Sequence, residues 1–322
     1  MYSTVNCSSK SSPIILVIFM TILFLGCAEP HGAKRGVHQN EPRLEEMQAQ
    51  ADIGLLARGG QSVDNVTTPP GYKPGDKLIT YEGPGWESQM VGYRLYLDGR
   101  NAIDVFGKKT TNMVLKQVGR GDDYHQMQPW GMDILKVGAS LGGGGFGVLE
   151  DGEARQIGPA IQFSAKILRN GPQRSTVEVI HSQSQKCGGD VTAKYTIEGG
   201  NRLTRVEVDS QCRLPLVAGL VKHPGTTQLS QPEKKAGWNY IARYGDQSLV
   251  PDNLGLAIFF QSDDIVAQGK DEDDDYIIFK NDSNPEYLFA AAWEQEPFGI
   301  RDINEFENWL KDTLIELNKT SP

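Results

Sequence analysis

The residues best suited to chemistry lie in one segment, residues 86–136, where aromatic and charged side chains are closely spaced. Such a mixture suits a sugar, because the C–H face of a sugar stacks on aromatic rings while its hydroxyls need paired donors and acceptors. Some members have a plain structural alternative, since Asp98 and Arg100 can form a local turn pair. The segment contains Trp86, Glu87, Arg94, Tyr96, Asp98, Arg100, Asp104, Lys108, Lys109, Tyr124, His125, Trp130, Asp133 and Lys136.

Three histidines follow the N-terminal region, and two of them stand where strands are expected to end. His125 belongs to a loop-like Asp-Asp-Tyr-His cluster just before Trp130, and His223 precedes a proline that ends strand pairing. His181 lies inside an alternating strand-like run and is interpreted as structural. Loops at strand ends often carry functional groups, so His125 and His223 are the candidates for proton transfer.

Short strands must position these side chains. Residues 90–98 alternate, which places Arg94 and Tyr96 on the face opposite Tyr93. Glycine is 36 of 322 residues, above the usual share, and mostly interrupts short apolar runs. The pattern predicts an all-β, mainly antiparallel sandwich. Further strands are expected at 113–118, 134–137, 146–149, 160–167, 175–182, 191–197, 203–208, 216–222, 255–260, 276–280 and 287–293.

One helix is expected to close the chain. Asp302 can cap it, Glu305 completes a capping box, and apolar residues follow at three- and four-residue steps from Ile303 to Leu317. A weaker helical pattern covers residues 44–57. The acidic run 271–275 predicts a solvated hairpin tip, with a calcium loop as the alternative, although the run lacks the glycine and distal glutamate of an EF-hand.

The N-terminus predicts export. Residues 14–25 are apolar, too short to span a bilayer as a mature helix, and precede Gly26-Cys27, which is similar to a bacterial lipoprotein signal. We therefore expect a signal peptide over 1–26, lipidation of Cys27, a flexible tether over 27–75 and a β-sandwich domain over 76–322. Ordinary cleavage and an uncleaved anchor are the alternatives, and each leads to an extracytoplasmic location.

Two cysteines remain in the domain, Cys187 and Cys212. Two strand-like runs lie between them, joined by Glu198-Gly199-Gly200-Asn201, which is a two-residue hairpin signal. In that register the two cysteines face each other, within disulfide range, and the expected compartment permits oxidation. The alternative is two buried free thiols, because Gly188-Gly189 can shift the register.

Charge and motif spacing exclude several functions. The formal charge is -9, which argues against a nucleic-acid partner because such a partner needs a clustered basic face. Gly142, Gly144 and Gly147 match a dinucleotide-binding spacing, but a strand and a turn follow them instead of a helix. We interpret these glycines as a tight bend or close backbone packing and expect no nucleotide. No zinc-finger, zinc-protease or esterase motif occurs.

Several long strings resemble a bacterial family known as domain of unknown function 4861, found in extracytoplasmic proteins of carbohydrate-degrading bacteria. The likeness covers residues 78–310. Many relatives carry an extra N-terminal β region in place of the tether. The resembling strings are Tyr-Glu-Gly-Pro-Gly-Trp-Glu-Ser at 81–88, the segment 92–109, Tyr-His at 124–125, Trp-Gly-Met-Asp-Ile-Leu-Lys-Val-Gly-Ala-Ser-Leu-Gly at 130–142, Tyr-Gly-Asp-Gln-Ser-Leu at 244–249, residues 252–257 and Ala-Ala-Trp-Glu-Gln-Glu-Pro at 291–297.

The resemblance implies a sandwich of the galactose-mutarotase or lyase supersandwich type. For one branch it implies an oligosaccharide dehydratase of ulvan breakdown, which removes water from a non-reducing-end uronate and leaves a 4,5-unsaturated residue. The alternatives are a non-catalytic glycan-binding lipoprotein, a sugar epimerase and a surface structural protein. We expect no cofactor or metal, with a divalent cation left open, and no membrane contact beyond the lipid anchor.

We assign roles from the chemistry of β-elimination, which needs a cation for the substrate carboxylate, a base at C5 and an acid for the departing hydroxyl. Arg94 is predicted to bind the carboxylate, with Lys136 and Arg100 in reserve. His125 is the expected base. Tyr96 or Tyr124 is the expected acid, and His223 is an alternative for either proton transfer. Trp86 and Trp130 are predicted to stack on the sugar, with Glu87 and Asp133 as further substrate ligands.

Overall fold

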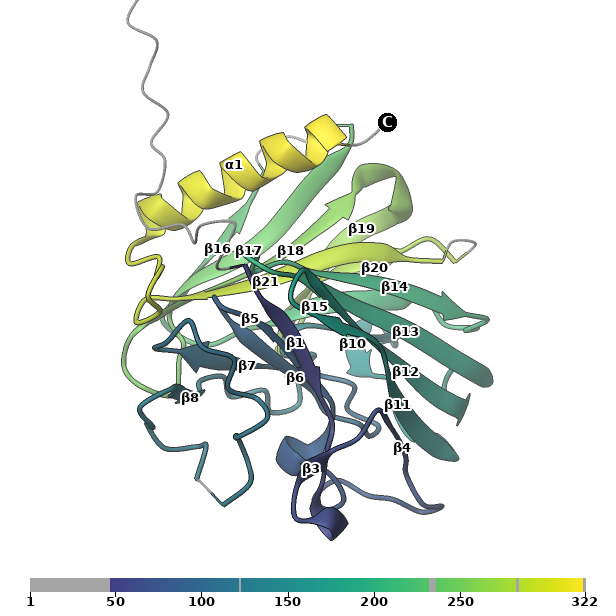
Figure 1. Ribbon diagram of the computed structural model, residues 1–322. Coiled ribbons are helices and arrows are strands. Elements are labelled where there is room, and N and C mark those ends of the chain that lie inside the picture. Colours follow the sequence, from purple (N-terminus) through teal and green to yellow (C-terminus); the bar gives the residue numbers. More distant parts are fainter. Residues whose placement is uncertain (1–46, 122, 232–235, 282–283, 321–322) are drawn as a thin grey trace, which may run out of the picture. The chain divides into compact units, whose positions relative to one another are not determined.

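The computed structural model describes residues 47–121, 123–231, 236–281 and 284–320. Its strands form three larger antiparallel sheets and one two-stranded ribbon (Figure 1). The largest sheet has nine strands. In spatial order they are β16 (Thr226–Ser230), β17 (Trp238–Asp246), β18 (Asn253–Gln261), β21 (Glu286–Trp293), β14 (Thr204–Ser210), β13 (Gly189–Glu198), β12 (Arg174–Ser184), β11 (Gln162–Gly171) and β4 (Asn65–Thr67).

Two five-stranded sheets complete the architecture. One has the order β1 (Ala49–Asp52), β5 (Gly85–Ser88), β6 (Gly92–Leu95), β7 (Ile103–Lys108) and β8 (Gly131–Asp133). The other has the order β10 (Glu153–Gln156), β9 (Gly143–Glu150), β15 (Leu216–Val221), β20 (Asp274–Phe279) and β19 (Ile265–Lys270). The ribbon pairs β2 (Gly54–Leu55) with β3 (Gln61–Ser62), and the short helices are η2 (Leu56–Arg58), η3 (Thr80–Glu82) and η4 (Ser262–Asp264).

The main core joins residues of all three larger sheets. Trp86 and Tyr93 of the first five-stranded sheet and Phe146 of the second are fully buried in one cluster with Phe289 and Trp293 of the nine-stranded sheet. β12 alternates buried and less buried residues along its length, as a strand with one covered face must. The predicted all-β, mainly antiparallel sandwich is therefore confirmed.

The C-terminal helix α1 (Ile303–Thr320) covers part of the other face of the nine-stranded sheet, over β17, β18 and β21 (Figure 1). Phe306, Leu310 and Leu314 are the buried stripe of the helix. Asp302 Oδ1 accepts the N–H groups of residues 304 and 305, so the predicted cap is confirmed. Glu305 differs slightly from a capping box, because its carboxylate accepts the N–H of Arg301.

Part of the predicted tether belongs to the fold. Residues 49–67 contain β1 to β4, and β1 pairs with β5 while β4 pairs with β11. The expected helix at 44–57 is wrong over its described part, because residues 49–52 form β1 and Ala49, Ala51 and Ile53 are buried against the sandwich. The predicted signal peptide, Cys27 and the tether up to residue 46 lie outside the described residues.

The only α-helix of the described residues, α1, is not apolar enough to qualify as a membrane span, and no other described helix does.

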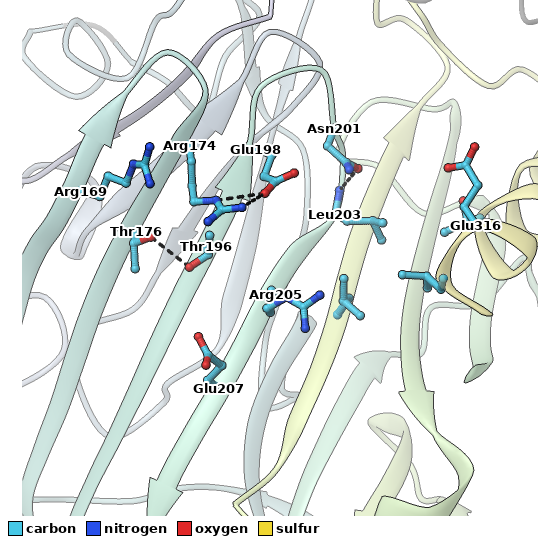
Figure 2. Close-up of a pocket in the computed structure, with 13 residues that line it drawn as sticks. Arg169, Arg174, Thr176, Thr196, Glu198, Asn201, Leu203, Arg205, Glu207 and Glu316 are labelled. Atoms are coloured by element: carbon cyan, nitrogen blue, oxygen red, sulfur yellow. Dashed lines mark hydrogen bonds and ion pairs between the residues drawn. The ribbon is translucent and has the colours of Figure 1, made fainter. Parts of the chain in front are cut away.

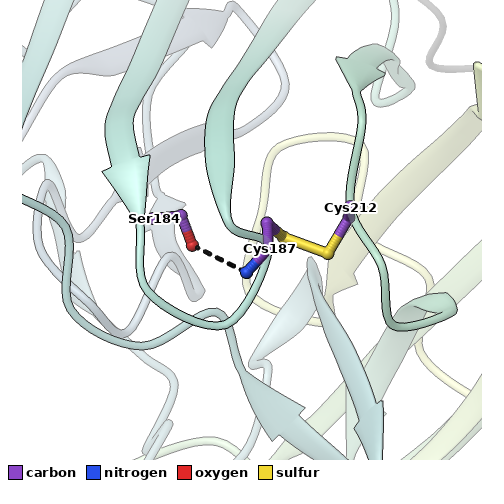
Figure 3. Close-up of a disulfide and its surroundings, with 3 residues drawn as sticks. All are labelled: Ser184, Cys187 and Cys212. Atoms are coloured by element: carbon purple, nitrogen blue, oxygen red, sulfur yellow. Dashed lines mark hydrogen bonds between the residues drawn. A yellow bond between two sulfur atoms is a disulfide. The ribbon is translucent and has the colours of Figure 1, made fainter.

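The predicted disulfide is confirmed, but the predicted hairpin register is wrong. Cys187 and Cys212 are bonded, with a Cα–Cα distance of 4.0 Å (Figure 3). The β13–β14 ladder instead pairs Ile197 with Thr204, because the loop between them is longer than two residues. The N–H groups of Gly199 and Gly200 donate to Gln173 and Gln89 outside the hairpin, and this holds the longer loop. The cysteines therefore meet in the turns beyond the ladder.

Two expected strands are turns or irregular segments. Residues 113–118 are apolar because Val114, Leu115 and Val118 pack in a small cluster with Phe106, and their chain turns back on itself. Residues 134–137 form only an isolated bridge, between Leu135 and Ser248. The expectation for the glycine run is confirmed, since a Cβ on Gly144 would lie 2.4 Å from that of Phe289, and only glycine allows this approach.

Candidate functional site

A buried ion cluster begins at the paired strands β6 and β7, whose register places Arg94 opposite Asp104. The side chain of Arg94 is only 1% exposed. Its Nη2 donates to Asp104 Oδ2 at 2.6 Å and to Asp133 Oδ2 at 2.7 Å, and its Nη1 donates to the carbonyl of Tyr81 at 3.0 Å. Every nitrogen of this guanidinium has a protein acceptor.

His125 forms the exposed end of the cluster. Asp133 ends β8, and its N–H donates to the carbonyl of Tyr124, which fixes the loop that carries His125. His125 Nδ1 lies 3.2 Å from Asp133 Oδ2, while its side chain is 57% exposed. The imidazole is therefore oriented by a buried carboxylate and has its other nitrogen directed away from that contact.

We name this group the Arg94 cluster: Arg94, Asp104, Asp133, Tyr96, Tyr124 and His125. Burial, followed by the charge of Asp133, raises the pKa of Asp104 to about 7. The hydrogen bond to Asp133 raises the pKa of His125. Burial raises the pKa of Tyr124, so its hydroxyl keeps its proton near neutral pH. Proton carriers with shifted pKa values therefore meet where the cluster reaches the surface.

Arg100 and Glu82 form one rim of the cluster. The guanidinium of Arg100 lies 3.7 Å from the centroid of the Tyr96 ring, whose hydroxyl donates to Asp104 at 2.8 Å. Arg100 also pairs with Asp98 at 2.6 Å and Glu82 at 3.3 Å, so the predicted turn pair is confirmed. Its Nη1 has no partner among the described residues, and the side chain is 24% exposed.

The backbone around this rim is strained. Tyr81, Glu82 and Asn101 have φ values of 41°, 64° and 47°, in the left-handed region that non-glycine residues rarely adopt. Tyr81 supplies the carbonyl that holds Arg94, Glu82 contacts Arg100, and Asn101 follows Arg100 directly. Such strain persists where the surrounding structure fixes it, and it gathers at functional sites.

The role predicted for Arg94 does not fit this geometry. An arginine that binds a substrate carboxylate needs free N–H groups facing solvent, and Arg94 is saturated and buried. It holds Asp104 and Asp133 in place instead. Asp133 is also a buried partner of His125 and not an exposed substrate ligand. Tyr96 is buried, and its hydroxyl contacts Arg94 and Asp104.

Trp86 and Glu87 are internal, against the prediction that they bind substrate. Trp86 is 0% exposed, stacks on Tyr195 at 4.9 Å and donates to Thr204. Glu87 is equally buried and pairs with Lys108 at 2.6 Å. Both lie on β5, which is buried on both faces and therefore has no solvent-exposed face.

Trp130 is half-buried at the edge of the cluster and meets Phe106 edge to face at 5.9 Å. The same Phe106 ring packs against Tyr124 at 6.0 Å. Trp130 and Tyr124 therefore share one support beside His125. This position is compatible with the stacking role predicted for Trp130.

His223 and Lys136 form a separate group. The His223 ring bonds the backbone of Lys136, and burial lowers the pKa of His223. Its Nε2 is buried without a partner among the described residues. No contact recorded for the described residues joins His223 to Arg94 or His125, so the expected convergence of both histidines is not found. Lys136 is exposed.

The acidic run 271–275 is a solvated hairpin tip only in part, because residues 271–273 connect β19 to β20 and Glu272 is exposed. Asp274 and Asp275 are buried, and Asp275 pairs with Arg243 of the facing sheet. Burial raises the pKa of Asp274 to about 7. The described residues hold no group of three or more histidine, cysteine, aspartate or glutamate side chains that could bind a metal ion, so the calcium alternative has no support in this part of the chain.

A groove of about 540 Å³ lies elsewhere, on the outer face of the nine-stranded sheet beside α1 (Figure 2). Arg174 pairs with Glu198 there, and Thr176 bonds Thr196 across the strands. The lining carries arginines and glutamates in equal number. It contains no predicted site residue, so this groove and the Arg94 cluster are different places.

Sequence reasoning missed two members of the site. Asp104 was noted in the segment 86–136 but given no role, although a hairpin between residues 92–95 and 103–106 would have paired it with Arg94. Glu82 lies in the resembling string at 81–88, but its place at the rim depends on a left-handed turn that no residue type there demands.

The model of one protein family, described as Domain of unknown function (DUF4861), matches residues 37–321. A search of curated proteins found no match.

Proposed function

Because this chain belongs to the domain of unknown function 4861 family, we propose that it is a carbohydrate-active lyase. In this proposal it removes water by β-elimination from the non-reducing-end uronate of an oligosaccharide, as the resemblance to the ulvan branch implies. The observation that carries the proposal is an exposed histidine, His125, held by the buried pair Asp133 and Arg94.

His125 is the base. With Nδ1 held by Asp133, its other nitrogen can take the proton from C5 of the sugar, and the carboxylate stabilises the imidazolium that forms. Tyr124 is the acid for the departing hydroxyl at C4, because its raised pKa keeps it protonated. Trp130 supports the sugar face.

Arg100 takes the role that Arg94 was expected to play. It is a partly exposed cation at the rim of the Arg94 cluster, stacked on Tyr96, and its Nη1 is free among the described residues to meet a carboxylate. Neutralising that carboxylate is required before the proton at C5 can leave.

The test is turnover of saturated glucuronyl- or iduronyl-rhamnose oligomers by the purified protein. We expect ultraviolet absorbance of a conjugated product and a mass loss of one water. His125→Ala should lower kcat/KM by about 10²–10⁴ with little change in stability, because the side chain is exposed. Gln126→Ala, in the same loop, is the matched control and should retain activity.

Three results would contradict the proposal. Affinity without turnover, unchanged by His125→Ala, would instead indicate a glycan-binding protein. Interconversion of anomers would indicate an epimerase. If the protein neither bound nor converted the oligomers, the result would indicate a structural surface protein.

We also propose an extracytoplasmic, lipid-anchored location. The Cys187–Cys212 disulfide supports it, because such bonds persist in oxidising compartments. Metabolic labelling with a radioactive fatty acid should mark the full chain and be lost in Cys27→Ala. Labelling that survives this change would contradict the anchor.

A further inference from the structure

The Arg94 cluster carries an excess of negative charge. Asp104 Oδ2 and Asp133 Oδ2 both bond the same nitrogen, Arg94 Nη2, at 2.6 and 2.7 Å. One guanidinium thus faces two carboxylates, and all three side chains are buried. An uncompensated charge in such a place is strongly destabilising, so the group needs one proton to be neutral.

Two places can hold that proton. One is the carboxylate pair, whose two negative charges repel each other beside Arg94 Nη2. The other is His125, whose Nδ1 lies 3.2 Å from Asp133 Oδ2. The charged and titratable groups around Asp104 are Arg94 from β6, Tyr96 just after β6 and Asp133 from β8, with Tyr124, His125, Asp123, Glu82 and Arg100 beyond them.

We propose that Asp104 is a positioning residue for His125: Asp104, Asp133 and His125 together hold one proton, which lies on the carboxylate pair when His125 is neutral and on His125 when both carboxylates are ionised. The exchange moves the proton across the Asp133–His125 contact and leaves the total charge unchanged. Asp104 never touches His125 and acts through Arg94 and Asp133.

Three features support this arrangement. Asp133 Oδ1 is buried and has no hydrogen-bond partner among the described residues, so no donor at that oxygen stabilises a negative charge. The raised pKa of Asp104, to about 7, places a carboxyl proton within the physiological range. The pKa of His125 is raised as well, as expected for a competing place for the same proton.

The arrangement has a consequence for the proposed lyase, on which its catalytic meaning rests. With the proton on the carboxylate pair, His125 is neutral and able to act as a base while the buried group stays uncharged overall. The proton equilibrium itself needs no substrate, so it can be tested without turnover.

The experiment is a proton NMR titration of the His125 ring in the full chain. Asp104→Asn leaves Arg94 and Asp133 balanced, so we expect the pKa of His125 to fall by about one unit. Asp274→Asn removes an equally buried carboxyl from β20, in another sheet, and should leave the His125 titration unchanged. An unchanged titration in folded Asp104→Asn would overturn the inference.

Infrared spectroscopy supplies an independent readout. A protonated carboxyl band near neutral pH should lose the part that comes from Asp104 in Asp104→Asn, while the part from Asp274, whose pKa is also raised to about 7, remains. Because the coupling is reciprocal, the band should persist to higher pH in His125→Gln. The absence of any such change in His125→Gln would overturn the proposal, whatever the activity of the protein.

Tyr96→Phe is the milder variant if Asp104→Asn does not fold. It removes a hydroxyl that donates to Asp104 at 2.8 Å and favours the ionised carboxylate. The proton should then stay on the pair more firmly, and the pKa of His125 should fall. A rise or no change contradicts the inference. An inactive protein that shows these shifts would count against the lyase alone.

Discussion

Two buried charge groups in the same five-stranded sheet differ in what they can do. Lys108 and Glu87 are fully enclosed, and their charges cancel at a distance of 2.6 Å. Lys108 also donates to the carbonyl of Ser88, and Glu87 accepts the N–H groups of Val114 and Leu115. Because these partners all lie inside the protein, the pair has no route for exchanging a proton with solvent.

The Arg94 cluster also combines basic and acidic side chains, but their charges do not cancel. It has one carboxylate more than its permanent cation can neutralise, and it reaches solvent through His125. The comparison teaches that burial and ion pairing alone do not mark a site. An unbalanced charge with an exposed titratable neighbour separates a group suited to proton transfer from one that only stabilises the fold.

The largest effect is expected from breaking the balanced pair. Glu87→Ala leaves Lys108 charged and unpaired in the core and removes the acceptor for residues 114 and 115. We expect a loss of about 3–5 kcal/mol in the free energy of unfolding, measured by urea denaturation. The control Glu198→Ala removes a half-exposed partner of Arg174 and should change stability by less than about 1 kcal/mol. Similar losses in both variants would refute the contrast.

The two groups should also give opposite dependences of stability on pH. The pKa of Asp104 is raised in the folded state, so its contribution is complete at low pH and is lost as pH rises through about 7. Burial lowers the pKa of Lys108, so its contribution grows as pH rises toward the ordinary lysine value.

Denaturant unfolding measured from acid to alkaline pH tests whether the two groups have these opposite pH dependences. Asp104→Asn should remove a decline of roughly 1–3 kcal/mol between acid and mildly alkaline pH. The double variant Glu87→Gln/Lys108→Met should remove the rise at high pH and leave the decline intact. If both variants changed the same part of the curve, the two groups would not be independent.

The smallest effect concerns the rim. Arg100→Lys keeps a positive charge but loses the planar fork that stacks on Tyr96. KM for a uronate oligomer should rise about tenfold with kcat nearly unchanged, and a carboxyl-reduced oligomer should show no such rise. Arg174→Lys, in the groove on the outer sheet face, is the control. A fall in kcat without a change in KM would assign Arg100 to another role.

Local patterns predicted most of the fold. The alternation of apolar and polar residues predicted the strands from β11 to β15. The capping residue and the apolar spacing predicted α1 and nearly its exact bounds. The patterns failed where tertiary contacts override them. The apolar character of residues 113–118 predicts a strand, but the N–H groups of Val114 and Leu115 donate to the side chain of Glu87, and that of Val118 donates back to Val114.

The site was predicted in part for the same reason. His125, Tyr124 and Trp130 come together as expected, since they are close in sequence and on one loop. His223 does not join them, and Trp86 turns inward to stack on Tyr195. Nothing local distinguishes an inward from an outward aromatic on a strand that is buried on both faces.

The sequence by itself determined residue types and periodicities, and with them the sandwich class, the capped helix, the disulfide partners and the segment that contains the Arg94 cluster. The tertiary structure decided which charges are paired, buried or exposed. Arg94 shows the difference between the two. The alternation of residues 90–98 places it correctly on β6, but its role depends on contacts with Asp104 and Asp133, which come from two other segments. Such encounters depend on packing in three dimensions, so the ionisation and reach of each side chain are properties of the fold.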